Sequence, residues 1–167
     1  FAGLADSFQH AICDVDHVGL GRLVHVDANG RAAIHAAAHR EFRRDQLDLG
    51  DVASDAASSM ARTAEERGVR VAVDPEPAIL AGDPVRLRQL VTILVDNAVR
   101  HSPSRSTVDV AIRRERDDAV LLVLDQGPGI PPDELPRVFD RFWRGAGEST
   151  GGTGLGLAIA AAIVTRH

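Results

Sequence analysis

Apolar side chains recur along the chain with two spacings, and each spacing indicates a type of secondary structure. Over residues 51–67 apolar positions repeat every fourth residue, which predicts a helix. A wider apolar stripe predicts a second helix beginning at Asp83-Pro84, because Asp caps free N–H groups and Pro suits the first helical position. This helix is expected to end before Pro103. A last helix is expected over residues 155–164, which are apolar and rich in Ala.

Four strands are predicted between these helices. Residues 69–73 and 107–112 alternate between apolar and polar, and residues 79–81 form a short apolar run. Residues 119–124 are apolar throughout, as expected for a central strand buried on both faces. The order helix, two strands, helix, two strands, loop, helix predicts an α/β (α+β) two-layer sandwich, in which helices cover one face of a mixed sheet.

The first 48 residues have a different pattern. They contain five of the seven His residues and lack strand-like alternation. Two helical stretches, over about 4–26 and 31–46, are predicted on either side of the turn at Asn29-Gly30. The predicted domains are therefore a helical N-terminal segment, 1–48, and a second domain, 49–167. In the second domain a short helix is expected over 132–139 and a mobile segment over 141–152.

Composition narrows the class of function. The 167 residues are 44% hydrophobic and 26% charged, which is typical of a soluble globular protein. The net charge of −5 disfavours a nucleic-acid partner, and no apolar stretch reaches the roughly 20 residues of a membrane span. The single cysteine, Cys13, excludes an intrachain disulfide and fits the reducing cytoplasm. All 19 basic residues are Arg, which excludes a Walker phosphate loop and a lysine Schiff base.

Three clusters of residues carry candidate chemistry: 96–101 at the end of the second helix, 125–130 after the central strand, and 151–157 before the last helix. The second cluster lies where ligands bind in α/β sheets, although its Asp-x-Gly-x-Gly pattern equally suits a simple turn. The glycines of the third would let backbone N–H groups approach phosphate oxygens at a helix N-terminus. Asn97 would face the same site only if its helix packs beside the central strand.

In this order the clusters resemble those of the ATP-binding catalytic domain of sensor histidine kinases. That family shares its Bergerat-type nucleotide fold with gyrase, the MutL ATPases and the heat-shock chaperone ATPases. Residues 96–103 look like the asparagine box, 125–130 like the first glycine box, 139–144 like the phenylalanine box and 152–157 like the second glycine box. The resemblance covers about two-thirds of the chain.

The resemblance implies a role for each residue around the nucleotide. Asn97 would hold Mg²⁺ through its carbonyl oxygen, a hard ligand for a hard cation. Arg100 stands where Lys is more common and would pair with the phosphates, and His101 stands where an aromatic residue often packs on the nucleotide. Asp125 would accept a hydrogen bond from the exocyclic amine of adenine and so select adenine over guanine.

The glycine boxes and a lid would complete the ATP site. Gly127, Gly129 and the neighbouring Ile130 would let the loop pass close to the base. Residues 131–151 would form the lid, from which Arg141 or Arg144 would reach the triphosphate, so that these two and Arg100 are the expected catalytic residues. The residues expected to wrap the phosphates at the start of the last helix are Gly152, Thr153, Gly154, Leu155 and Gly156.

Two departures from the family bear on the reaction. Ile93 stands where histidine kinases usually have a second Asn and hydrolytic relatives have Glu, which disfavours ATP hydrolysis and calls one Mg²⁺ contact into question. No histidine box is found, since none of the five N-terminal His residues is followed by the acidic residue that serves as base. Autophosphorylation within this chain is therefore not expected.

Two further departures concern the ends of the domain. The family has a two-helix dimerisation hairpin before it, and residues 1–46 could be a remnant of that hairpin that still dimerises, or an ordinary extension. The family usually continues beyond the position of His167 with two closing strands. Without these strands a sheet edge is expected to be uncovered.

The sequence therefore predicts a two-component protein histidine kinase. It would transfer the γ-phosphate of Mg-ATP to a histidine on a separate protein, with a response regulator downstream. The alternatives are an ATP-binding signalling module without phosphotransfer, a hydrolytic ATPase of the same superfamily, and a serine kinase of the anti-sigma-factor type.

Overall fold

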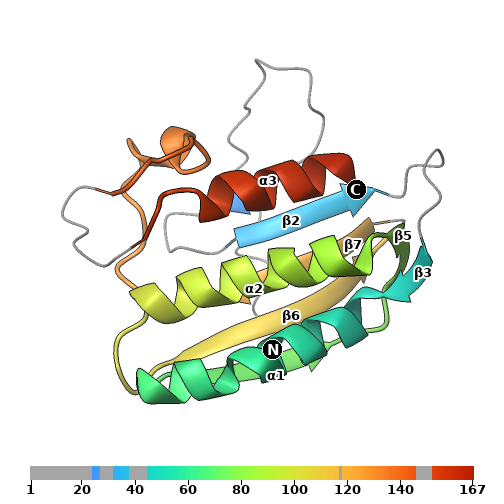
Figure 1. Cartoon of the computed structure of the whole chain (residues 1–167), viewed down its shortest axis with the longest axis horizontal. Coiled ribbons are helices and arrows are strands. Elements are labelled where there is room, and N and C mark those ends of the chain that lie inside the picture. Colours follow the sequence, from blue (N-terminus) through green and yellow to red (C-terminus); the bar gives the residue numbers. More distant parts are fainter. Residues whose placement is uncertain (1–23, 27–31, 38–44, 117, 146–151) are drawn as a thin grey trace.

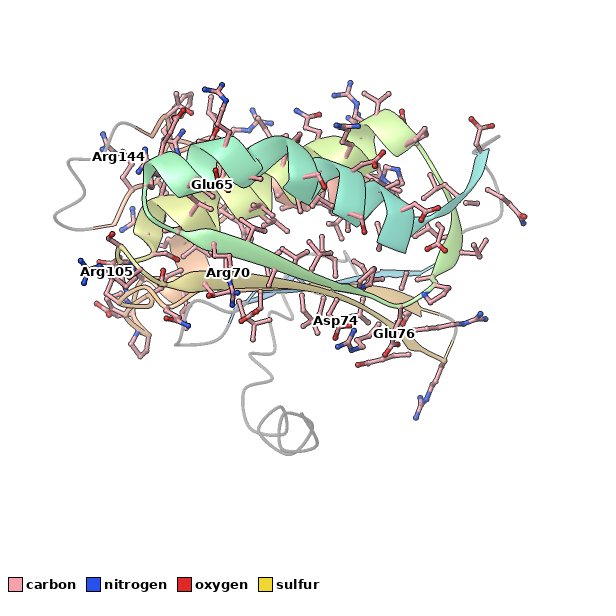
Figure 2. The ribbon with its side chains drawn as sticks, turned by 90° about the horizontal axis from the view of Figure 1, so that it is seen from below. Glu65, Arg70, Asp74, Glu76, Arg105 and Arg144 are labelled. Atoms are coloured by element: carbon pink, nitrogen blue, oxygen red, sulfur yellow. The ribbon has the colours of Figure 1, made fainter. Side chains whose placement is uncertain are left out.

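Helices cover one face of a mixed sheet in the computed structural model of the chain, which describes residues 24–26, 32–37, 45–116, 118–145 and 152–167. Figure 1 looks through the helices onto the strands, and the turned view in Figure 2 shows the helices on one side and the strands on the other. The predicted two-layer α/β sandwich is confirmed.

The main sheet has five strands in the order β1-β2-β7-β6-β4. Their bounds are β1 Val24–Val26, β2 Ala32–Ala37, β4 Arg70–Pro75, β6 Thr107–Glu115 and β7 Asp118–Leu124. Only the β4–β6 pair is parallel, and the other neighbours are antiparallel. Val120 and Leu121 of β7 are each 1% exposed, which confirms that this strand is buried on both faces. A second sheet pairs β3 (Asp45–Asp48) with β5 (Ile79–Gly82).

Among the described residues, three α-helices form the other layer: α1 Leu49–Glu66, α2 Pro84–His101 and α3 Gly156–Arg166. The Oδ1 atom of Asp48 caps α1 by accepting from the backbone N–H of Gly50, and it also accepts from that of Ala78 beside β5. Asp83 caps α2 as predicted. These caps set where α1 and α2 begin, because each satisfies backbone donors that the helix itself leaves unpaired.

The core lies between α2 and the sheet. The predicted apolar stripe of α2 is buried along its whole length, from Leu87 to Ala98, and Val99 is buried as well. It shares one cluster with α1, α3 and the inward side chains of β6 and β7, namely Val108, Val110, Ile112, Leu121 and Val123. Since α2 is the central helix, the polar residues on its last turns are held at a set place relative to the end of β7.

The far end of α3 is tied to the start of α2 by the buried side chain of His167. Its Nε2 accepts from the backbone N–H of Asp83 at 3.0 Å, and its Nδ1 lies 2.8 Å from the carbonyl oxygen of Ile163. Because a backbone N–H can only donate, Nε2 is unprotonated and Nδ1 donates to Ile163. This places α3 along α2 in the opposite direction (Figure 1).

The helices predicted over 4–26 and 31–46 are wrong wherever the structure describes them, because residues 24–26, 32–37 and 45–48 are strands. Strand β2 pairs antiparallel with β7 along its full length, and β3 pairs with β5. The side of β7 that faces away from β6 is thus paired with β2, and β1 and β4 are the edge strands of the described sheet. Alanine is the strongest helix former, but helix propensities amount to less than about 1 kcal/mol per residue, and the need to pair the N–H and C=O groups of a buried strand such as β7 outweighs them. The rest of the proposed dimerisation hairpin lies outside the described residues.

The short helix predicted over 132–139 is also wrong in extent. It is a single 3₁₀ turn, η2, at Leu135–Arg137. The prolines at 131, 132 and 136 lack the backbone donors that an α-helix would need. Residues 146–151 of the segment predicted to be mobile lie outside the described part. Among the helices that the structure describes, none is long and apolar enough to cross a membrane.

Candidate functional site

The last two turns of α2 carry one side of the candidate site. Ile93, Asn97 and Arg100 are four and three residues apart, so they share one face of the helix. This face meets the start of α3, since a Cβ built on Gly156 would lie 3.4 Å from Cγ2 of Ile93. The asparagine cluster and the second glycine cluster are therefore neighbours. The condition set for Asn97, that its helix packs beside the central strand, is met.

Arg100 forms an ion pair on this face with Asp96, one turn earlier. Its Nε lies 2.8 Å from Oδ2 of Asp96, and the two side chains are 34% and 36% exposed. Asp96 was part of the predicted cluster, but no role was predicted for it. The i, i+4 spacing of acid and Arg is the sequence signal that could have indicated this pair.

The loop after β7 lies against the end of α2. Oδ1 of Asp125 accepts from the backbone N–H of Gly127 at 2.7 Å, which orients the carboxylate. A Cβ on Gly127 would lie 2.7 Å from the carbonyl oxygen of His101, closer than side-chain atoms approach backbone. Only glycine therefore allows this loop to reach the end of α2. Gly129 has a φ of +74°, which glycine adopts without strain.

The described end of the predicted lid is joined to the second glycine cluster. The backbone N–H of Phe142 donates to the carbonyl oxygen of Gly154 at 2.8 Å. Gly154 has a φ of +67°, and a Cβ on it would lie 2.6 Å from the backbone carbon of Phe142. Arg141 and Arg144 flank this joint and are exposed. In Figure 2, Arg144 lies at the end of the molecule where α2 ends.

The N-terminus of α3 faces the same region without a side-chain cap. Leu155 occupies the N-cap position and no side-chain hydrogen bond closes the helix there. The first N–H groups of a helix have no intrahelical acceptor and carry partial positive charge, so they favour an anion. In Figure 1 the start of α3, the end of α2 and the described lid residues lie at one end of the molecule.

The structure thus brings the predicted clusters together through three contacts: Ile93 with Gly156, His101 with Gly127, and Phe142 with Gly154. Ile130 is half-buried in the loop after β7, and Gly152 and Thr153 lead into Gly154. Sequence reasoning missed Ser102, whose buried Oγ has no hydrogen-bond partner within the described residues. Its place directly after His101 was the available signal.

The residues present suit a metal that arrives with a phosphate ligand. Within the described ranges, no group of three or more His, Cys, Asp or Glu side chains could hold a metal ion. Asn97 offers one neutral oxygen, and Ile93 on the same face offers none. Mg²⁺ commonly binds through one or two protein oxygens together with substrate phosphates, so this donor set fits Mg²⁺ bound with a nucleotide.

Comparison with known proteins agrees with this geometry. The family model of histidine kinase-, DNA gyrase B- and HSP90-like ATPases matches residues 82–167, which contain all three clusters. The chain belongs to this ATPase family. The predicted resemblance is confirmed, and the chain contains an ATP-binding domain of the sensor histidine kinase type.

Individual relatives within the family are sensor kinases. The sensor protein kinase PmrB of Pseudomonas aeruginosa is 34% identical over 122 residues, 72% of this chain and 26% of PmrB. The solved mycobacterial sensor histidine kinase MprB is 34% identical with a TM-score of 0.69, over 74% of this chain and 81% of that one. The solved ATP-binding domain of PrrB from Mycobacterium tuberculosis is 27% identical with a TM-score of 0.60, over 75% and 82%. The chain spans 14% to 28% of the length of the first two curated relatives it matches.

Proposed function

We propose that this ATPase-family chain binds Mg-ATP and transfers its γ-phosphate to a histidine on a separate protein, which passes it to a response regulator. The observation that carries the proposal is the meeting of the three clusters at one end of α2. Each of the three contacts involves a glycine to which the family resemblance assigns a place at the nucleotide. The joined residues are 12 to 63 positions apart in the sequence.

The phosphates would lie at the start of α3. Its uncapped N–H groups, the close backbone approach at Gly154 and the guanidinium of Arg100 are the donors that a lysine-free chain can offer a polyphosphate. Gly152, Thr153, Leu155 and Gly156 would line this end.

The adenine ring would lie beside the end of β7. The bond from the Gly127 N–H fixes the carboxylate of Asp125, and an ionised carboxylate can only accept hydrogen bonds. It would accept from the exocyclic amine of adenine, whereas guanine presents an oxygen at that position and would be rejected. Gly129 and Ile130 would border the base, and His101 would pack on the nucleotide.

Asn97 would hold Mg²⁺, because it is the single amide side chain on residues 94–101 of α2 and Ile93, one turn earlier, packs against Gly156 and has no oxygen to offer. When bound, the ion neutralises charge on the phosphates. Ile93 also cannot act as a base toward water. The site therefore favours transfer to a better nucleophile over hydrolysis of ATP.

The transfer would form a bond from an imidazole nitrogen to the γ-phosphorus and break the bond to the bridging oxygen, releasing ADP. Such reactions are accelerated by positioning and charge neutralisation. Arg100 from α2 and Arg141 or Arg144 from the lid would supply positive charge around the γ-phosphate. The base that takes the imidazole proton would come from the partner, and the reaction would take place in the cytoplasm.

The experiment is to mix the chain with Mg-ATP labelled at the γ-phosphate, alone and with histidine-bearing partner proteins encoded nearby. Acid-labile label on a partner is the expected result. Label on no partner, despite ATP binding, would contradict the transfer and favour a signalling module, which the aliphatic Ile93 would also allow. Release of free phosphate by the chain alone would favour the hydrolytic ATPase.

A further inference from the structure

Asp96 is the charged neighbour of Arg100 on α2, and no role in binding or catalysis has so far been given to it. The distance of 2.8 Å from Oδ2 to Nε joins the two side chains one helical turn apart, and each is about one-third exposed. The pair lies on the last two turns of α2, where the helix meets the loop after β7 and the start of α3.

A second ion pair, on α1, has the same spacing but differs in the exposure of its side chains. Arg62 and Glu66 on α1 have the same spacing and the same 2.8 Å distance, but their side chains are 85% and 61% exposed. Solvent and salt screen an exposed pair strongly and leave its side chains free to move. The half-buried pair on α2 is screened less, so it restricts the arginine more.

The contact engages only the Nε side of the Arg100 guanidinium. Nε is buried and lies 2.8 Å from Oδ2 of Asp96, so the terminal nitrogens are the donors that remain for a ligand. No hydrogen bond from the terminal nitrogens of Arg100 to a described residue is found. A guanidinium carries five N–H donors in a rigid fork that matches phosphate oxygens.

We infer that Asp96 is a positioning residue that holds the guanidinium of Arg100 at the phosphate side of α2, ready to bind the triphosphate. This inference rests on the proposed ATP binding. An arginine side chain without a partner samples many rotamers, and a ligand that binds it must first order it. Asp96 therefore lowers the cost of binding by ordering Arg100 in the free protein, although its own charge is of the wrong sign for phosphate.

The test is a double-mutant cycle with Asp96→Asn, Arg100→Ala and the double variant, measured by calorimetric titration with ATP and with adenosine in the presence of Mg²⁺. Asp96→Asn is expected to weaken ATP binding about fivefold in the unmodified background and to have no effect once Arg100 is Ala. Adenosine affinity is expected to stay the same, because adenosine has no phosphate. Asp96→Glu should restore ATP binding, and Glu66→Gln on α1 is the matched control without effect.

Three results would overturn the inference. Stronger ATP binding by Asp96→Asn would show that the carboxylate acts mainly by repelling phosphate. An equal loss in both backgrounds would show that Asp96 acts independently of Arg100, and a parallel loss for adenosine would show a structural role. If the unmodified chain binds adenosine but ATP no more tightly, Arg100 does not bind phosphate and the inference fails while the adenine assignment stands. If the chain binds neither compound, the proposed function itself fails.

Discussion

The N-termini of α2 and α3 begin two neighbouring antiparallel helices but are built in opposite ways. Asp83 closes α2 by accepting from the backbone N–H groups of Val85 and Arg86, at 2.9 and 3.1 Å. Proline at position 84 adds a residue that has no N–H to satisfy. At α3 a leucine stands in the capping position with no side-chain bond, after a run of glycines.

The difference separates a structural helix end from the helix end proposed to bind phosphate. A side-chain cap stabilises a helix by about 1 kcal/mol, so an uncapped N-terminus forgoes stability that a single Ser or Asp would supply. At α3 the free donors point to the region where the ends of α2, β7 and the lid meet. An anionic ligand would satisfy them.

The largest expected effect is at the joint before α3. Gly154→Ala places a Cβ 2.6 Å from the backbone of Phe142 on a residue with a φ of +67°. We expect destabilisation of about 2 kcal/mol and loss of most ATP affinity, measured by urea unfolding and calorimetry. Gly156→Ala is the control for stability, because its Cβ meets only Ile93 at 3.4 Å. Equal stability of the two variants would contradict the role of Gly154.

The next largest effect tests Asp125, the residue proposed to read the base. Asp125→Asn should lower ATP affinity about tenfold and reduce the preference for ATP over GTP, because an amide can donate as well as accept. The melting temperature should hold, since an Asn oxygen can still accept from the Gly127 N–H. Asp118→Asn at the other end of β7 is the control. Unchanged affinity and base preference for Asp125→Asn would show that another group reads the base.

Removing the cap of α2 should affect stability alone. Asp83→Ala is expected to lower the free energy of unfolding by about 1 kcal/mol, because two backbone donors lose their acceptor. ATP affinity of the folded protein should not change, since this end of α2 is opposite the site. Asp83→Asn keeps an acceptor, so its free energy of unfolding should lie within a few tenths of a kcal/mol of the unmodified protein. A drop in ATP affinity for the alanine variant would mean that the two ends of α2 are coupled.

The smallest effect comes from giving α3 the cap that it lacks. Leu155→Ser would place a hydroxyl oxygen where it can accept from the first N–H groups, in competition with phosphate. Relative to Leu155→Ala, which loses the same apolar contact, the serine variant should be more stable and bind ATP about threefold more weakly. Matching affinities for the two variants would show that the helix terminus contributes little to binding.

The secondary structure predicted from the sequence is correct where local signals are strong and agree with the packing. The stripe and cap of α2 and the continuous apolar run of β7 correctly predicted a central helix over a central strand. It failed for residues 32–37, where a run rich in Ala and lacking alternation suggested a helix but forms β2. The partner that decides this conformation is β7, more than eighty residues further along the chain, and no local pattern reports it.

The sequence by itself determined the order of the helices and strands from α1 onward and the cap of α2, because these depend on neighbours within one or two turns. It also determined the absence of lysine and the residue types available to a nucleotide. Only the tertiary structure decided that Gly127 lies under His101, that Gly154 meets Phe142 and that Ile93 faces Gly156. Those contacts join residues that are 26, 12 and 63 positions apart in the sequence, respectively. Such contacts arise from the packing of α2 and α3 on the sheet, and a site built from several segments exists only after that packing has formed.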